Sequence, residues 1–368
     1  MKPDYYIGLM SGTSLDGIDA VLVDFSQPKP VLIEAVFQPY DSNLRTQLLK
    51  LHHADFDELN RAALLGNELS SRYADAVLAL LTKSTINAQE ITAIGCHGQT
   101  IRHCPEKEKR YTIQLVNASL LAELTDITVV ADFRSRDIAA GGQGAPLVPA
   151  FHHALFSDDS KHRVIVNIGG IANITSLDPK GSVIGFDCGP GNMLMDEWCL
   201  RHTGKNYDAQ GEWAKKGTVI HSLLAAMMNE DFFSCTPPKS TGRDLFNRQW
   251  LERKLSHYAH EPAENVQATL LQLTATTIAS AIEDYCSTAS EIYVCGGGAH
   301  NTQLINQLSN ILSDRSVTST KELGVDADWV EAFAFAWLAQ QTILRKPGNL
   351  CAVTGAQGER VLGAIYPA

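Results

Sequence analysis

The chain has 368 residues, which at the usual domain size is enough for two domains. Hydrophobic residues make up 45% and charged residues 19%, the balance of a globular protein with a large core. A formal net charge of −11 repels phosphate backbones and argues against nucleic acid or an anionic membrane as partners. Eight scattered cysteines lack metal-ligand or disulfide-framework spacing, and no apolar run could span a bilayer, so we expect a soluble, cytoplasmic protein.

The first predicted elements are three strands joined by short turns. They cover residues 5–10, 18–25 and 31–37, and a glycine-containing bend separates the first two at 11–17. A run with helical periodicity at 68–81 then leads into a buried strand and a glycine turn within 90–99. Another strand is predicted at 127–131.

The same order of elements returns in the middle of the chain. Strands are predicted at 163–168, 171–177 and 182–186, and a helical run at 269–285 leads into a strand and a triple-glycine turn within 291–300. Coincidence is the alternative, but the matching order favours a duplicated domain. The fold class is therefore predicted to be α/β, with two related lobes and a cleft between them that would bind ligands.

A run of small residues at 141–149 marks the predicted boundary between the lobes. It divides the chain into an N-terminal lobe at 1–140 and a C-terminal lobe at 141–368. The last segment, 353–366, reads equally as strand or helix and could return to the first lobe.

The bend between the first two strands is the first candidate phosphate site. Its glycines permit positive φ and close backbone approach, its hydroxyls add donors, and its two aspartates could hold a hydrated Mg²⁺. An ordinary hairpin stabilised by Ser and Asp is an equal alternative. The candidate ATP-binding residues here are Gly12, Thr13, Ser14, Leu15, Asp16, Gly17, Ile18 and Asp19.

Two further glycine turns are candidates for nucleotide binding. Gly169 and Gly170, with Asn173, can form a second phosphate-facing turn, although a tight hairpin in which Asn adopts left-handed geometry is equally consistent. Gly296, Gly297 and Gly298 follow a buried strand and precede a helix predicted at 301–312, so a nucleotide could lie against the backbone there.

Asp187 is the candidate catalytic base. It follows the strand predicted at 182–186 and precedes a Gly-Pro-Gly-Asn turn and a helix at 193–200. A carboxylate in that position could accept a proton from water or a hydroxyl group. Helix capping or turn stabilisation by Asp187 is the alternative.

Four residues are candidate sugar contacts: His97, Gln99, Arg134 and Glu331. Arginines that follow a strand can bind polar ligand groups with two hydrogen bonds, and Arg136 could replace Arg134. For each candidate an ordinary role is open: a packed histidine, a surface ion pair, or a first-turn carboxylate that complements a helix dipole.

Together these segments resemble the anhydro-N-acetylmuramic acid kinases of bacterial cell-wall recycling. The matching segments run in order over nearly the whole chain: GLMSGTSLDGIDA (8–20), CHGQT (96–100), ADFR (131–134), GGQGAPLVPAFH (141–152), NIGGIANIT (167–175), FDCGPGN (186–192) and CGGGAHN (295–301). The resemblance implies an actin/hexokinase/Hsp70-type (ribonuclease H-like) fold with ATP, as its Mg²⁺ complex, in the cleft.

The resemblance also implies the reaction. The γ-phosphoryl of ATP would pass to O6 of 1,6-anhydro-N-acetylmuramic acid while water, activated by Asp187, opens the anhydro bridge at C1. A kinase of another sugar or carboxylate, or a nucleotide-gated binding protein, are the alternatives from the residues alone. The sequence does not identify the metal ligands and leaves a homodimer open.

Overall fold

The structure, a computed structural model, describes residues 3–53, 55–105, 108, 110–243 and 245–368. The chain divides into two compact units, residues 1–155 with 329–368 and residues 156–328. This division differs from the predicted boundary after residue 140. The loop after that point is tied to the C-terminal segment, because Gln143 N donates to Thr354 O (2.8 Å).

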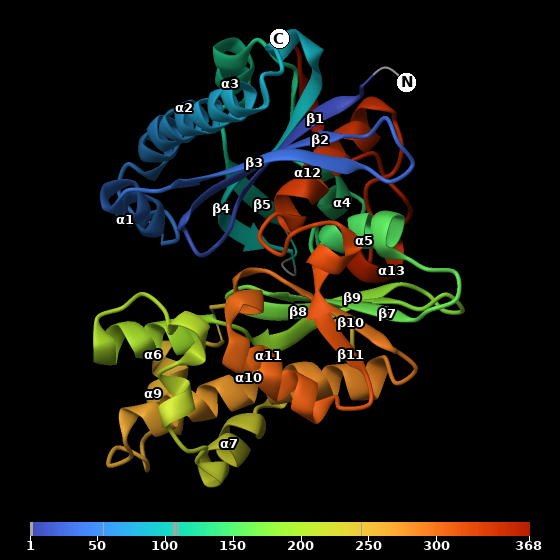
Figure 1. Ribbon diagram of the computed structural model, residues 1–368. Helices are drawn as coiled ribbons and strands as arrows, with labels where there is room; N and C mark the ends of the chain where they lie inside the picture. Colours follow the sequence, from blue (N-terminus) through green and yellow to red (C-terminus); the bar gives the residue numbers. More distant parts are fainter. Residues whose placement is uncertain (1–2, 54, 106–107, 109, 244) are drawn as a thin grey trace. The chain divides into compact units, whose positions relative to one another are not determined.

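The first unit is built on a seven-stranded sheet (Figure 1). Its strands are β1 (Tyr5–Ser11), β2 (Gly17–Asp24), β3 (Val31–Pro39), β4 (Ile91–Cys104), β5 (Tyr111–Leu115), β6 (Val129–Ala131) and β12 (Ala364–Tyr366). Their order is β12-β6-β4-β1-β2-β3, with β5 paired to β4 outside this path. β1, β2 and β3 pair antiparallel, whereas β4 runs parallel to both β1 and β6.

Helices cover both faces of this sheet. They are α1 (Ser42–Lys50), α2 (Glu58–Ser84), α3 (Ala118–Thr125), α4 (Ser135–Ala139), α5 (Val148–Phe156), α12 (Val330–Ile343) and α13 (Cys351–Thr354), with a 3₁₀ turn η1 (Ala88–Glu90). Ile7 and Leu9 of β1 share a core with α2 and α3. The backbone of α12 approaches Gly8 and Gly95 so closely that a Cβ on either glycine would collide with it. Since successive strand residues point to opposite faces, α12 covers the face opposite α2.

The second unit is built on a five-stranded sheet in the order β11-β10-β7-β8-β9. Its strands are β7 (Arg163–Ile168), β8 (Ile171–Leu177), β9 (Ile184–Pro190), β10 (Glu291–Cys295) and β11 (Ser316–Ser319). Its helices are α6 (Met193–Thr203), α7 (His221–Met228), α8 (Asp231–Ser234), α9 (Arg248–Lys254), α10 (Ala263–Tyr285) and α11 (Thr302–Ile311), with 3₁₀ turns η2 (Ala209–Gly211), η3 (Ala214–Lys216), η4 (Gly297–His300) and η5 (Thr320–Leu323).

The two units repeat one topology, which confirms the predicted duplication. Each has three antiparallel strands in chain order, then a helix and a strand parallel to the first, then a second helix and another parallel strand. In the first unit these later elements are α2, β4, α3 and β6, and in the second α10, β10, α11 and β11.

Three local predictions were wrong in detail. β4 does not end in a turn at residue 96–99 but continues to Cys104, because Gly98 adopts a left-handed φ of 75° and the strand goes on to pair with β5. In the first hairpin the left-handed residue is Leu15 (φ 57°), and neither glycine of that hairpin is. The strand containing Asp187 extends to Pro190 rather than ending at Phe186.

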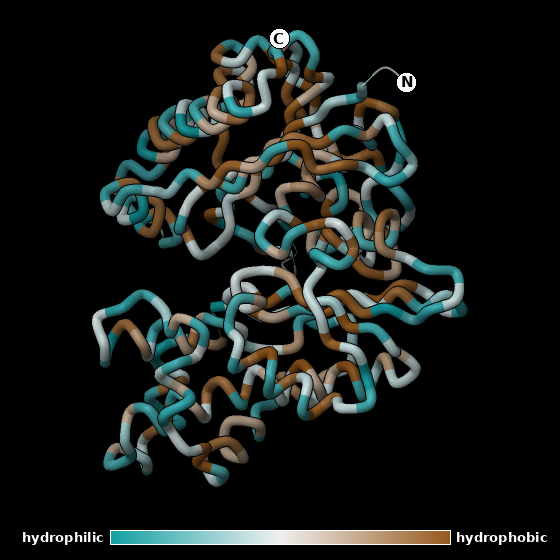
Figure 2. The backbone as a smooth tube through the Cα atoms, in the orientation of Figure 1, coloured by the Kyte–Doolittle hydropathy of each residue, from teal (hydrophilic) through white to brown (hydrophobic). Residues whose placement is uncertain are grey.

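The C-terminal segment returns to the first unit as α13 and β12, and β12 pairs antiparallel with β6. Figure 2 shows hydrophobic residues concentrated on the strands of each sheet and hydrophilic residues in the connecting loops. Within the described part of the chain, no helix combines the length and apolarity required to cross a membrane.

Candidate active site

The side chain of Gln99 holds the hairpin between β1 and β2 in place. Its Nε2 donates to the carbonyl oxygen of Gly12 (3.0 Å), and Gln99 itself is fully buried. The turn is closed by a bond from Leu15 N to Gly12 O (3.3 Å), and Ser14 Oγ donates to Asp16 Oδ1 (2.6 Å). Thr13, Ser14 and Asp16 are exposed at its tip, whereas Ile18 is buried and Asp19 is half-buried. Gln99 therefore supports the hairpin, and its contact with sugar stays a prediction.

The candidate glycine positions differ in whether the fold has room for a side chain. A Cβ on Gly17 would collide with β3, and one on Gly298 with Ile168, so the fold itself requires glycine at both. At four other positions the nearest atoms to an added Cβ lie 3.4–3.8 Å away and φ is not left-handed: Gly12, Gly169, Gly170 and Gly297. Nothing within the described chain excludes a side chain at these four. Glycine at such positions leaves room for the close approach of a ligand.

The turn between β7 and β8 has its carbonyl groups occupied within the second unit. Gly191 N and Met193 N donate to Gly170 O (2.9 and 3.2 Å), and Asn192 N donates to Gly169 O (2.8 Å). The turn is thereby held against the start of α6. Neither Asn167 nor Asn173 has the left-handed φ that the alternative interpretation requires.

Three polar residues form a row across neighbouring strands of the second sheet. Asn167 on β7 pairs with Asn173 on β8, and Asn173 pairs with Asp187 on β9. Paired residues on adjacent strands share a face, so all three side chains lie on the same side of the sheet. Phe186 and Cys188, which flank Asp187, belong to the hydrophobic core on the other side. Asp187 is thus part of a polar strip at the end of a hydrophobic sheet.

The carboxyl group of Asp187 has a raised pKa. Burial raises the pKa of its carboxyl group to about 6, and a hydrogen bond from the backbone N of Thr241 to Oδ2 (2.9 Å) opposes that rise. The backbone N of Asp187 donates to Lys239 O (3.1 Å). Sequence reasoning missed this contact with the segment before α9. The polar run Lys-Ser-Thr-Gly-Arg at 239–243 was the available signal.

In the first unit, Arg134 and His97 are in direct contact. Arg134 donates to His97 Nε2 from Nε (3.1 Å) and from Nη2 (2.9 Å), and to Gly144 O from Nη1 (2.8 Å). Because arginine only donates, His97 accepts through Nε2 and carries its proton on Nδ1. Burial and the charge of Arg134 hold the pKa of His97 well below its usual range, so the ring is neutral. Arg136 is exposed, so the geometry favours Arg134 over Arg136.

Glu331 belongs to the same cluster as Arg134. It is in the first turn of α12, where burial raises the pKa of its carboxyl group, the charge of Arg134 lowers it, and Asp16 raises it further. Glu331 and Arg134 are half-buried. The first unit therefore brings three of the four predicted sugar contacts into one cluster of His97, Arg134 and Glu331.

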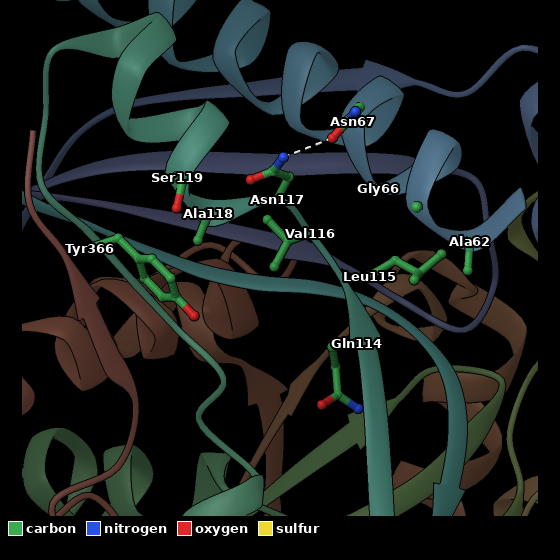
Figure 3. A pocket seen from close by; sticks show the side chains of 11 residues that line it. Ala62, Gly66, Asn67, Gln114, Leu115, Val116, Asn117, Ala118, Ser119 and Tyr366 are labelled. Carbon is green, nitrogen blue, oxygen red and sulfur yellow. Dashed lines mark hydrogen bonds between the residues drawn. The ribbon is translucent and has the colours of Figure 1, made fainter. Parts of the chain in front are cut away.

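A separate hollow of about 570 Å³ lies between α2, the segment that joins β5 to α3, and β12 (Figure 3). Asn117 Nδ2 donates to Asn67 Oδ1 at its edge (2.7 Å). None of the candidate residues lines it, so it is not part of the candidate active site.

The repeated topology defines an α/β fold of the actin-like type, with two ribonuclease H-like units. A solved structure of the (R)-2-hydroxyglutaryl-CoA dehydratase component A from Acidaminococcus fermentans is similar, with a TM-score of 0.50 and 11% sequence identity, over 90% of this chain and 96% of that one. Likeness at this level of identity concerns the fold alone.

The chain belongs to the anhydro-N-acetylmuramic acid kinase family, whose model matches residues 4–368. Proteins named anhydro-N-acetylmuramic acid kinase from Nitrosospira multiformis and Nitrosomonas europaea are each 61% identical to it. The match covers 100% of both chains in the first case, and 99% of this chain and 100% of the relative in the second.

Proposed function

We propose that this chain phosphorylates 1,6-anhydro-N-acetylmuramic acid at O6 with ATP and opens the anhydro ring with water, giving N-acetylmuramic acid 6-phosphate and ADP. The observation that carries the proposal is membership of the family over residues 4–368. We also propose that the reaction takes place in the cytoplasm, where ATP is available and where the eight free thiols would stay reduced.

We propose that the glycine turn of each unit binds ATP phosphates. In the first unit Gly12, and in the second Gly169 and Gly170, have room for a ligand where a side chain would stand. The carbonyl groups of both turns accept hydrogen bonds within their own unit, which leaves backbone N–H groups to donate to phosphate oxygens. Gly297 would face the rest of the nucleotide.

Mg²⁺ would enter with the nucleotide. The described residues contain no group of three His, Cys, Asp or Glu side chains that could hold a metal by itself. Mg²⁺ usually binds one or two carboxylates, phosphates and water, and Asp16 and Asp19 fit that donor set. Asp16 is exposed, and its Oδ1 accepts a hydrogen bond from Ser14. When bound, the ion would neutralise charge on the transferred phosphoryl group.

Asp187 would act as the base in ring opening. Its carboxylate removes a proton from water, the water oxygen forms a bond to C1, and the C1–O6 bond breaks. O6 then takes the γ-phosphoryl group, ADP leaves, and the proton on Asp187 returns to solvent. Water is the group that needs a base, because O6 has no proton before the bridge opens.

The cluster in the first unit would bind the sugar. Arg134 is held by His97 and Gly144, so its guanidinium is oriented before a ligand arrives. A preorganised arginine suits the lactyl carboxylate of the substrate, with which it can form two hydrogen bonds. Glu331 can accept hydrogen bonds from the sugar.

A product assay in ¹⁸O-labelled water tests the proposed reaction. Mass spectrometry should find one phosphoryl group at O6 and one labelled oxygen at C1, with one ADP formed for each sugar. A product that keeps the anhydro ring, or ADP release that does not depend on sugar, would contradict the proposal. Sugar-independent turnover would instead fit a nucleotide-gated binding protein.

The substitution Asp187→Asn tests the assignment of the base. It should reduce ring opening and phosphorylation together by about 10²–10⁴-fold, because loss of a general base costs that much, while ATP binding measured by calorimetry stays unchanged. Asp159→Asn, an exposed aspartate of the same unit, is the matched control and should keep full activity. Ring opening that survives in Asp187→Asn would rule out this base.

A further inference from the structure

The segment between α8 and α9 lies against β9 at Asp187. Two main-chain bonds hold it there: Asp187 N donates to Lys239 O (3.1 Å), and Thr241 N donates to Asp187 Oδ2 (2.9 Å). The second bond ends on the carboxylate that the proposed reaction uses. The backbone of Thr241 therefore contacts the carboxylate of the proposed base directly.

Lys239 anchors this segment. Its Nζ donates to the carbonyl oxygens of Phe232 and Phe233 (3.3 Å each) at the end of α8 and lies 4.8 Å from the centroid of the Phe232 ring. These bonds satisfy carbonyl groups that a helix end leaves without partners. Lys239 thus holds the backbone in place two residues before Thr241.

The hydroxyl group of Thr241 has no partner within the described chain. Its Oγ1 is buried and makes no hydrogen bond there. A buried hydroxyl without a partner destabilises the fold, and valine would fill the same space without that cost. A polar group of this kind beside a reacting carboxylate indicates that its partner arrives with the ligands.

Covalent geometry places the hydroxyl close to the carboxylate. Threonine Oγ1 lies about 3 Å from its own backbone N, which is 2.9 Å from Asp187 Oδ2, so the two oxygens are at most about 6 Å apart. One water molecule can bridge groups at such a separation. Rotation about χ1 of Thr241 turns the hydroxyl toward the carboxylate without disturbing the backbone bond.

We propose that Thr241 is a further catalytic residue, whose hydroxyl group binds the water molecule that Asp187 deprotonates. This rests on the proposed role of Asp187. A water molecule held by the carboxylate alone is free to rotate, whereas a second hydrogen bond to Thr241 fixes it with one lone pair directed at C1. Thr241 gains and loses no proton, and the proton passes from water to Asp187.

The test compares Thr241→Val, which removes the hydroxyl and keeps the backbone N–H, with Thr241→Ser, which keeps both. Thr241→Val should lower kcat by about 10- to 100-fold, the usual cost of a misplaced reactant, with KM for the anhydro-sugar unchanged. Thr241→Ser should keep most of the activity. Thr236→Val, the same change at an exposed position of the same segment, is the matched control and should behave as the unaltered chain.

Three results would overturn the inference. They are an unchanged kcat in Thr241→Val, a rise in sugar KM with unchanged kcat, which would indicate a sugar contact, and equal losses in the Val and Ser variants, which would indicate a packing effect. The variant Asp187→Asn distinguishes a failure of the role proposed for Thr241 from a failure of the role proposed for Asp187. If that variant is inactive while Thr241→Val is active, only the role of Thr241 fails; if it keeps ring opening, the proposed base fails.

Discussion

The position of Asp187 in β9 determines the environment of its carboxylate. Its neighbours Phe186 and Cys188 point into the core, and strand alternation turns the carboxylate to the other face, beside Asn173. There it is buried enough for its pKa to rise to about 6. The group is ionised at neutral pH, yet it is a stronger base than an exposed aspartate.

The pKa of Asp187 predicts an acid limb in the rate profile. The value of kcat/KM should fall about tenfold per pH unit below about pH 6, because only the carboxylate form accepts a proton. Measurement of kcat/KM from pH 5 to 8 checks this. A profile that stays flat down to pH 5 would contradict it. Thr241→Val should keep the same limb, since it keeps the N–H bond to Asp187.

Unfolding must be measured over the same pH range, because buried groups act on stability in opposite directions. The native carboxyl group of Asp187 binds a proton near pH 6, above its pKa in the unfolded chain, so this group stabilises the fold as pH falls. Burial lowers the pKa of His97 well below its usual range and that of His152 to about 3. These histidines bind protons only after unfolding and destabilise the fold below about pH 6.5.

At the scale of elements, α4 and the C-terminal segment jointly position Arg134. The fully buried carboxylate of Asp137 accepts hydrogen bonds from Gly144 N (2.8 Å), Asn349 Nδ2 (2.7 Å) and Thr354 Oγ1 (2.8 Å). The carbonyl group of Gly144 in turn accepts from Arg134. The carboxylate of Asp137 thus links the last segment of the chain to the proposed sugar site.

Asp137→Asn should weaken both stability and sugar binding. An amide offers one acceptor oxygen to three donors, so we expect a loss of about 2–4 kcal/mol in the free energy of unfolding. KM for the sugar should rise several-fold while KM for ATP changes little, because Gly144 no longer holds Arg134. Denaturant unfolding and steady-state kinetics measure both effects.

Thr342→Val is the matched control for Asp137→Asn. Thr342 donates to Leu338 O (2.8 Å) and Leu362 O (2.5 Å) in the same unit, away from Arg134. It should lower stability and leave KM for the sugar unchanged. Equal changes in sugar KM for both variants would show that Asp137 acts only through stability.

The elements that could be predicted are those encoded by neighbouring residues. The strands of both hairpins, the helices before β4 and β10, and the repeated order followed from apolar patterns and turns a few residues long. The packing of α12 on Gly8 and Gly95 joins residues far apart in the chain, and no local pattern encodes such a contact. The extension of β4 past Gly98 likewise depends on pairing with β5, which comes later in the sequence.

The candidate site, like the fold, was predictable where neighbouring residues encode it. The glycine turns are recognisable because they follow strands directly, and Asp187 is recognisable because it stands shortly before the Gly-Pro-Gly-Asn run at 189–192. Thr241 reaches Asp187 from a segment that has no regular secondary structure, so spacing gave no reason to join the two. The support that Gln99 gives the hairpin could not be predicted, because its bond to the backbone of Gly12 depends on how β1 and β4 lie side by side.

At the scale of the whole molecule, the two units differ in how the chain builds them. The second unit is continuous, and the described residues of its hydrophobic core lie between Val164 and Val317. The first unit is discontinuous and takes α12 from the far end of the chain. The second unit therefore forms from one continuous stretch of chain, whereas the first unit needs a helix from a distant part of the sequence.

This difference predicts how fragments behave. Residues 156–328 expressed alone should fold, with a cooperative thermal transition by circular dichroism and dispersed amide NMR signals, because their five strands pair only with one another. Residues 1–155 alone should not, since loss of α12 uncovers the face of the sheet at Gly8 and Gly95 and exposes apolar side chains such as Tyr6 and Phe25, which pack in its vicinity.

Joining residues 1–155 to 329–368 through a flexible Gly/Ser linker is the matched control and should restore cooperative unfolding, because it returns α12 to the sheet without the second unit. Cooperative folding of residues 1–155 by themselves would contradict the role given to α12. If residues 156–328 instead stay unfolded while the linked form of the first unit folds, the second unit depends on the first for its stability, and the duplicated topology does not make the two units independent in folding.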